Sequence, residues 1–141
     1  KTGKWLYKRY EIKEFDGVKV GFFALVGTDT AVKSDPEIMR SYIIEDPIKV
    51  GKEMVAFLES KVDVIVAITH LGVSDEGFEN AKNLSEKVKG INVILDGHSH
   101  TPCKSAACYN EGKKIIKFSK KSVSFYPPCS LYSLLLGLFY R

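Results

Sequence analysis

The stretches VDVIVAIT at residues 62–69 and NVIL at residues 92–95 decide the fold of this chain. Both are nearly continuous apolar runs, the pattern of parallel strands that are covered on both faces of a sheet. Between them a helix is predicted over residues 75–89, with Asp75 as its N-cap and Gly90 at its C′ position. The apolar residues of this helix recur at helical spacing: Phe78, Ala81, Leu84 and Val88. Strand, helix and strand make one βαβ crossover unit, so both strands run in the same direction.

A β-hairpin is predicted upstream of this unit. Residues 10–15 and 18–26 are rich in strand-forming side chains, and Asp16-Gly17 between them suits the two positive φ angles of a type I′ turn. The second run becomes apolar on both sides, so we expect this strand to be covered on both faces in the interior of the sheet. Residues 27–36 are interpreted as a loop, in which Asp35-Pro36 initiates a turn and Asp29 is a loop carboxylate.

A second helix is predicted to begin at Asp46-Pro47 and to end near Lys61. Asp46 is a suitable N-cap, and proline is favoured at the first helical position. Val50, Met54, Phe57 and Leu58 form one apolar face, and we expect Met54 and Phe57 in the core. The order hairpin, helix, strand, helix, strand predicts an α/β fold, a partial α/β-sandwich with an irregular C-terminal tail.

Composition and charge limit the classes of function. The chain has 141 residues, 45% hydrophobic and 27% charged, as expected for one globular domain or part of one. Residues 1–101 carry 14 Lys and Arg against 16 Asp and Glu, whereas residues 102–141 carry 7 against 1. Because the basic surplus lies in a terminal segment, charge does not favour binding to nucleic acid. The longest apolar run, residues 129–140, spans about 18 Å as a helix and is too short to cross a membrane.

The regular pattern fades after residue 101. The three cysteines, Cys103, Cys108 and Cys129, match neither a disulfide framework nor a C-x-x-C metal motif, so the redox compartment stays open. The elements predicted there are a strand over residues 114–119 and a short helix lined by Leu131, Leu134, Leu135 and Leu138. We interpret residues 102–141 as a diverged or frame-shifted tail.

The chain contains three histidines, His70, His98 and His100, which follow the ends of the two predicted buried strands. Parallel strands end at the same edge of a sheet, which is where α/β proteins build their sites. His98 and His100 would point to the same side of an extended segment, and Gly97 would allow a sharp turn. We therefore predict that the three imidazoles bind metal. Asp96 is either a hydrogen-bond partner of an imidazole or simply a strand-end carboxylate.

Two motifs are similar to those of calcineurin-like metallophosphoesterases. VIVAITHLG at residues 64–72 and ILDGHSHT at residues 94–101 look like the last two metal motifs of that family. The most similar branch is the bacterial group of 5′-nucleotidases, UDP-sugar hydrolases and 2′,3′-cyclic phosphodiesterases. Residues 10–27 and 46–60 resemble middle segments of this branch, so the likeness covers residues 1–101.

The resemblance implies a dinuclear centre in which two divalent ions, manganese, zinc or similar, activate a hydroxide that attacks phosphorus. By motif matching, His70 and His98 would bind one metal and His100 the other. The earlier D-x-H, G-D and G-N-H-D/E motifs of the family have no counterpart in this sequence. Asp96-Gly97-His98 has the form D-x-H, but neither G-D nor G-N-H follows it, so it is interpreted as part of the closing G-H-x-H motif. Residues 1–101 would then be the C-terminal half of a metallophosphoesterase catalytic domain, with the N-terminal half-domain missing.

The predicted function is therefore that of a fragment of a dinuclear-metal phosphoesterase that hydrolyses nucleotide phosphoesters and is inactive alone. The alternative is a truncated, non-catalytic metal-binding chain. An amidohydrolase barrel also uses H-x-H, but near its start, and this chain is too short for eight strands. A serine hydrolase or a nucleotide-binding loop is disfavoured because G-x-S-x-G and G-x-x-x-x-G-K-[ST] are absent. The resemblance implies a periplasmic or cell-surface location.

Overall fold

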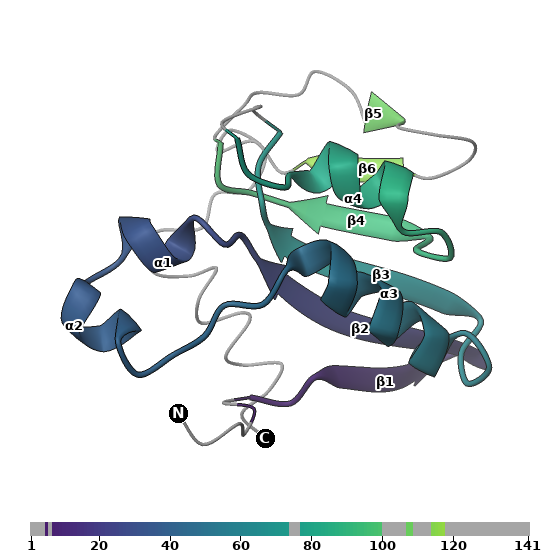
Figure 1. The fold of residues 1–141 in the computed structure, drawn as a ribbon. Helices are drawn as coiled ribbons and strands as arrows, with labels where there is room; N and C mark the ends of the chain where they lie inside the picture. Colours follow the sequence, from purple (N-terminus) through teal and green to yellow (C-terminus); the bar gives the residue numbers. More distant parts are fainter. Residues whose placement is uncertain (1–4, 6, 74–76, 100–106, 109–113, 118–141) are drawn as a thin grey trace, which may run out of the picture.

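The computed structural model describes residues 5, 7–73, 77–99, 107–108 and 114–117 of the chain. These residues form one mixed six-stranded sheet in the order β1-β2-β3-β4-β6-β5 (Figure 1). Strands β2, β3, β4 and β6 are parallel neighbours, whereas β1 and β5 pair antiparallel with β2 and β6. The bounds of the strands are β1 Tyr10–Phe15, β2 Val18–Val26, β3 Val64–His70, β4 Val93–Asp96, β5 Ala107–Cys108 and β6 Lys114–Lys117.

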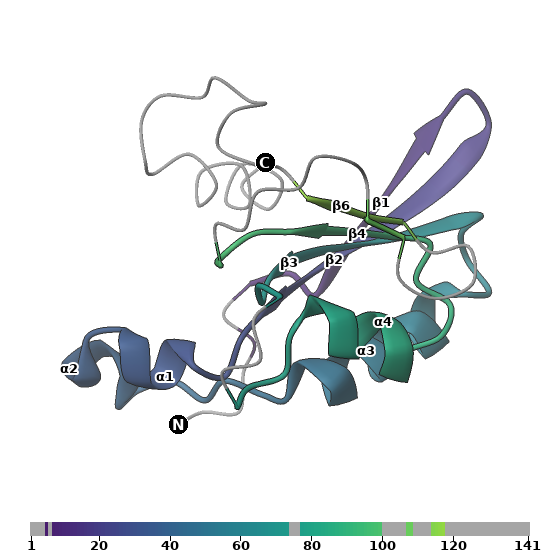
Figure 2. The same cartoon turned by 90° about the horizontal axis from the view of Figure 1, so that it is seen from above.

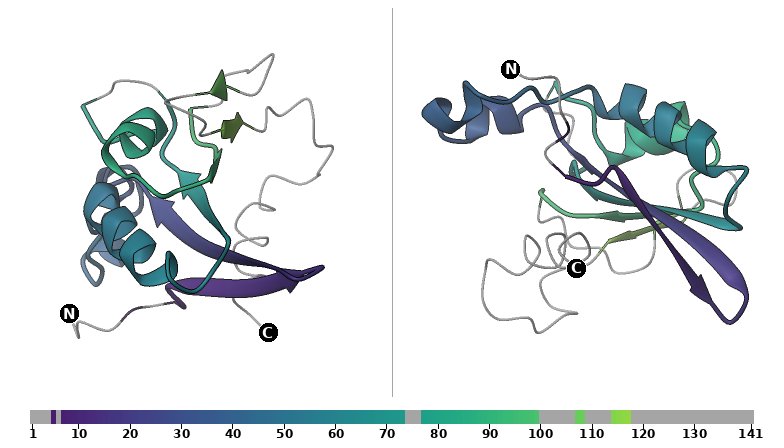
Figure 3. Two further views of the ribbon diagram at one scale, coloured as in Figure 1. Left: turned by 90° about the vertical axis from the view of Figure 1, so that its right-hand side faces the viewer. Right: turned by 90° about the horizontal axis from the view of Figure 1, so that it is seen from below.

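Two longer helices cover one face of the sheet. The helices are α1 Thr30–Lys33, α2 Pro36–Met39, α3 Pro47–Leu58 and α4 Ala81–Lys87. The chain passes from β2 through α3 to β3, and from β3 through α4 to β4. Both crossovers therefore step across the sheet in the same direction, and their right-handedness puts both helices on the same side (Figures 2 and 3).

The predicted hairpin is confirmed. Asp16 and Gly17 have φ angles of 49° and 84°, as a type I′ turn requires, and β2 lies between β1 and β3. β2 is therefore an interior strand of the sheet, as expected, but within the described residues its two faces are not equally covered. Phe23 is buried beneath the helices, but Phe22 on the opposite face is only half-buried, because α3 and α4 share one side of the sheet.

Helix α3 begins where the sequence predicts. Asp46 accepts a hydrogen bond from the backbone N–H of Ile48 at 2.9 Å, and Pro47 is the first helical residue. Phe57, however, is not a core residue: it is 38% exposed, and its ring centroid is 4.8 Å from that of Tyr10 in β1. Its neighbour Leu58 takes the buried position, about 100° away around the helix.

The predicted loop at residues 27–36 instead contains a short helix and the start of another. Helix α1 occupies Thr30–Lys33, and Asp35-Pro36 begins α2 instead of a simple turn. Asp35 accepts a hydrogen bond from the backbone N–H of Glu37 at 2.8 Å, which is the same N-cap arrangement that begins α3. A single helical turn has no apolar periodicity to reveal it, so the loop interpretation was wrong in this part.

Helix α4 is shorter than the predicted helix over residues 75–89. Its N-cap is Asn80, whose side chain accepts a hydrogen bond from the backbone N–H of Asn83 at 3.0 Å, while Asp75 lies outside the described residues. Phe78 precedes the helix and is 40% exposed. Val88 is the C-cap, so Gly90, with φ of 92°, lies in the turn that leads towards β4 and is not at C′.

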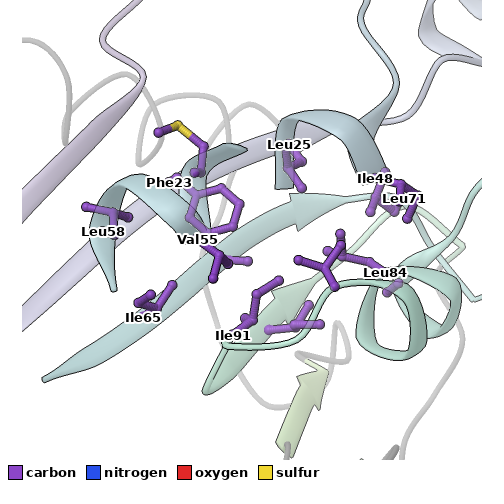
Figure 4. Packing of buried hydrophobic residues seen from close by; sticks show 14 residues of the cluster. Phe23, Leu25, Ile48, Val55, Leu58, Ile65, Leu71, Leu84 and Ile91 are labelled. Atoms are coloured by element: carbon purple, nitrogen blue, oxygen red, sulfur yellow. The ribbon is translucent and has the colours of Figure 1, made fainter. Parts of the chain in front are cut away.

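The hydrophobic core lies between the sheet and the two longer helices (Figure 4). Phe23 from β2, Leu58 from α3 and Leu84 from α4 are fully buried there. Burial of each such side chain contributes roughly 1.5–3 kcal/mol to folding. A Cβ on Gly51 of α3 would lie 3.1 Å from Leu84 Cδ1, so α3 and α4 pack closely at this position. The core therefore lies on the helix-covered side of the sheet.

The strand predicted at residues 114–119 is present as β6, which pairs in parallel with β4. Cys108 belongs to β5, whereas Cys103, Cys129 and the helix predicted at residues 131–138 lie outside the described residues. Within the described part of the chain, no helix has the length and apolar character needed to cross a membrane.

Candidate functional site

The structure brings His70 and His98 together at one edge of the sheet. His70 is the last residue of β3, and His98 follows β4 by two residues. Their ring centroids are 4.8 Å apart, and the rings are nearly perpendicular at 72°. The expected convergence of two strand ends is therefore present in the fold. His100 lies outside the described residues.

The register of β3 and β4 explains this approach. Thr69 is paired with Asp96, and the backbone N–H of Gly97 donates to the carbonyl of Thr69 at 3.2 Å, so both strands end at the same level. Gly72 then allows the chain after β3 to pass close to the segment after β4. A Cβ there would lie 3.0 Å from Ser99 Cβ and 3.3 Å from His98 Cδ2, and Gly72 has φ of 71°.

The sharp turn after β4 falls at His98 and not at Gly97. His98 has φ of 88°, whereas Gly97 is not among the positive-φ residues of the described chain. This conformation is uncommon for a side-chain-bearing residue and costs on the order of 1–3 kcal/mol. The neighbouring hydrogen bond from the backbone N–H of Val73 to Ser99 Oγ, at 3.3 Å, helps to hold the segment in place. Backbone strain is thus concentrated at one of the predicted metal ligands.

Asp96 joins the two strand ends. It is 6% exposed, and its Oδ1 accepts hydrogen bonds from Thr69 Oγ1 at 2.7 Å and from the backbone N–H groups of Leu71 at 2.9 Å and Gly72 at 3.3 Å. Burial raises the pKa of the Asp96 carboxyl, although these hydrogen bonds oppose the change. Of the two interpretations from the sequence, these contacts favour the strand-end carboxylate.

Asp29, which the sequence indicated only as a loop carboxylate, lies beside His98 in the structure. It is 5% exposed, and its Oδ2 lies 3.0 Å from His98 Nε2 and 3.0 Å from Lys33 Nζ. Burial alone would raise the pKa of the Asp29 carboxyl, but interactions with Lys33 and His98 outweigh it and lower this pKa below its ordinary value. Asp29 lies three residues beyond the end of β2, so the rule that selected the histidines would also have selected it.

The described residues at these strand ends include side chains of the types that bind metals. Two imidazoles beside a carboxylate are nitrogen and oxygen donors that suit zinc, manganese and similar divalent ions. Within the described ranges, however, no group of three or more His, Cys, Asp and Glu side chains is arranged to hold an ion. The chemistry of these donors therefore fits a divalent metal, and of the three predicted ligands the described residues contain His70 and His98.

The curated relatives of this chain include nucleotide phosphoesterases. The trifunctional nucleotide phosphoesterase protein YfkN of Bacillus subtilis is 34% identical over 119 residues, covering 82% of this chain and 8% of that protein. A 5′-nucleotidase of Vibrio vulnificus is 30% identical over 113 residues, covering 72% of this chain and 20% of the enzyme. No family model matches the sequence. The chain thus spans at most a fifth of the length of these two curated relatives.

The fold comparison agrees with the sequence comparison. The crystal structure of the calcineurin-like phosphoesterase YfkN from Bacillus subtilis matches with a TM-score of 0.69 at 24% identity, covering 84% of this chain and 43% of that structure. The expected α/β architecture, a partial metallophosphoesterase domain, is therefore confirmed. From its sequence relatives and its fold, the chain belongs to the 5′-nucleotidase family of calcineurin-like phosphoesterases.

Proposed function

We propose that this chain is part of a metal-dependent phosphoesterase that acts on nucleotide phosphoesters, with His70, His98 and His100 as metal ligands. The approach of the His70 and His98 rings to 4.8 Å at the ends of two parallel strands carries this proposal. The names of the relatives, a nucleotide phosphoesterase and a 5′-nucleotidase, support the substrate class. His100 is included because it completes the G-H-x-H motif.

The residues of this chain would hold and orient the metal ligands. His70 and His98 would share one divalent ion, and His100 would bind the second. Two such ions would supply a hydroxide nucleophile and neutralise negative charge on the phosphate. Asp96 supports both histidines because it ties the end of β4 to the chain that follows β3. The strand ends therefore present the rings with little freedom to move apart.

We further propose that residues 1–101 are the C-terminal half of a catalytic domain and that residues 102–141 are a diverged or frame-shifted tail. The 141 residues contain no motif matching the family's G-D or G-N-H-D/E segments, so the chain by itself would be inactive. Translation of the coding DNA in the other frames beyond codon 102 tests the origin of the tail. Family-like strands in another frame support a frame shift, and their absence from both frames contradicts it. A periplasmic or cell-surface location is also proposed.

A non-catalytic metal-binding role is the second candidate. It is favoured by the lack, within the described part of the chain, of any three-residue group arranged to hold an ion. A site with two imidazoles can bind a divalent ion without the second metal that the phosphoesterase reaction requires. The two candidates agree on metal binding and differ on hydrolysis.

The test combines calorimetry with a hydrolysis assay. We expect the chain to bind Mn²⁺ and to release no nitrophenol from a nitrophenyl phosphodiester. A chimera of Bacillus subtilis YfkN, in which residues 1–101 of this chain replace the matching segment, should hydrolyse the same diester and 5′-nucleotides. His98→Ala should abolish hydrolysis by the chimera, whereas Lys49→Met, which removes an exposed ammonium on α3, should not.

Each outcome of this test separates the candidates. A folded chimera that binds Mn²⁺ without hydrolysing either substrate contradicts the phosphoesterase proposal and supports the non-catalytic role. Turnover by the isolated chain that depends on His98 contradicts the proposal that it is inactive alone. Unchanged Mn²⁺ affinity after His98→Ala removes the basis of both candidates.

A further inference from the structure

Asp29 contacts His98 of the histidine pair but is not one of the proposed metal ligands. Its Oδ2 is 3.0 Å from Nε2 of His98, and its side chain is 8% exposed. The His98 side chain is 27% exposed, so this partly buried pair is less weakened by solvent than a contact between two exposed side chains. The contact joins the segment after β2 to the segment after β4, 69 residues later in the chain.

The local structure fixes the Asp29 carboxylate. The carbonyl of Asp29 accepts hydrogen bonds from the backbone N–H groups of Val32 at 3.0 Å and Lys33 at 2.9 Å, in the first turn of α1. Lys33 Nζ also contacts Oδ2 at 3.0 Å. A Cβ on Gly27 would lie only 2.3 Å from Asp29 Oδ1, so the carboxylate occupies space that the absence of a side chain at Gly27 leaves free.

The His98 ring is held from the other sides. One side meets the His70 ring at 72°, and a Cβ on Gly72 would lie 3.3 Å from Cδ2 of His98. A neutral imidazole has one N–H donor and one acceptor nitrogen, whereas an ionised carboxylate only accepts. With Asp29 at Nε2, the hydrogen resides on Nε2. The lone pair of the ring is then on Nδ1.

We propose that Asp29 is a positioning residue that accepts a hydrogen bond from Nε2 of His98 and thereby makes Nδ1 the metal-binding atom of that ring. The role of Nδ1 rests on the proposed function, but the Nε2–H hydrogen bond exists without metal. Carboxylates that accept from a metal-binding histidine fix its tautomer and ring orientation. Their removal typically weakens metal binding by about 10–100-fold.

NMR of the metal-free, ¹⁵N-labelled chain tests the hydrogen bond. At a pH where the ring is neutral, we expect His98 to carry its hydrogen on Nε2 and to show an N–H signal that exchanges slowly with water. Asp29→Ala should remove this protection, whereas Asp29→Asn should retain it because an amide oxygen also accepts. His98→Ala assigns the signal, and Lys49→Met serves as the charge-removal control.

Two NMR results would overturn the proposal. One is a wild-type His98 ring with its hydrogen on Nδ1. This result needs only the wild-type chain, so it is decisive even if Asp29→Ala fails to fold. The other is an unchanged, protected Nε2–H signal in a folded Asp29→Ala chain, with folding checked by circular dichroism.

Calorimetry with Mn²⁺ tests the metal part separately. We expect the dissociation constant to rise about 10–100-fold in Asp29→Ala, to rise less in Asp29→Asn and to stay unchanged in Lys49→Met. Equal affinity of wild type and Asp29→Ala overturns the positioning role. If the wild type binds no Mn²⁺ although the Nε2–H signal behaves as expected, the proposed function fails and the Asp29–His98 hydrogen bond stands.

Discussion

Replacing Gly72 by alanine should destabilise the chain more than a positive φ angle alone can explain. Gly72 has φ of 71°, and an alanine in this region costs about 1 kcal/mol. The new Cβ would also lie 3.0 Å from Ser99 Cβ and 3.2 Å from the backbone nitrogen of Ser99. A backbone atom cannot rotate away, so the segment after β4 must shift, and such overpacking costs about 1–3 kcal/mol. The total expected loss is about 2–4 kcal/mol.

Gly17 provides the matched control for this variant. It has φ of 84° in the hairpin turn, and a Cβ there would meet no atom within 4 Å, so Gly17→Ala pays the backbone cost alone. For a chain of this size, we expect Tm to fall by about 4 °C for Gly17→Ala and by about 8 °C or more for Gly72→Ala. Circular dichroism during heating measures both. Equal losses of Tm in the two variants would refute the close packing of Gly72 against the His98 segment.

Three further predictions concern the core and the two buried carboxylates. Leu84→Ala should cost about 2–5 kcal/mol in urea denaturation and Phe57→Ala clearly less, because Leu84 is fully buried and Phe57 is 38% exposed; similar losses would contradict this burial. Because folding lowers the pKa of the Asp29 carboxyl, wild type should be more stable than Asp29→Asn at pH values well above 3.8, the pKa in the unfolded chain. This difference in stability should disappear as the pH falls through the lower pKa of the folded chain. A difference in stability that grows as the pH falls would contradict a lowered pKa of Asp29. Asp96→Ala should cost more than Asp96→Asn, because alanine leaves three buried donors without their acceptor; equal unfolding free energies would argue against the hydrogen bonds at Asp96.

The strands and the start of α3 could be predicted because their signals are local. Asp16-Gly17 and Asp46-Pro47 dictate a turn and a helix start through their own backbone preferences. The side of the sheet that the helices occupy depends on the direction of successive crossovers, and this is a property of the whole topology. Phe78 matched the helical spacing of α4, but Asn80 provides the N-cap, so periodicity placed the helix start too early.

The histidine pair could be predicted because both residues follow strands whose direction is evident from the sequence. Asp29 also follows the end of a strand, but it was interpreted only as a loop carboxylate because no sequence motif surrounds it. Its partners, Lys33 and His98, show its role only when the fold brings His98 beside it. The positive φ angle of His98 was missed for a related reason: glycine at position 97 offered the easier turn, and tertiary contacts placed the turn one residue later.

Titration of the ¹⁵N-labelled chain with Zn²⁺, followed through the imidazole signals, tests most directly whether His70 and His98 share one ion. Both rings should respond together and saturate at the same ratio of metal to protein. The response of His98 should weaken strongly when His70 is replaced by alanine. A response of one ring alone, or a His98 response that is unchanged in His70→Ala, would contradict the shared site.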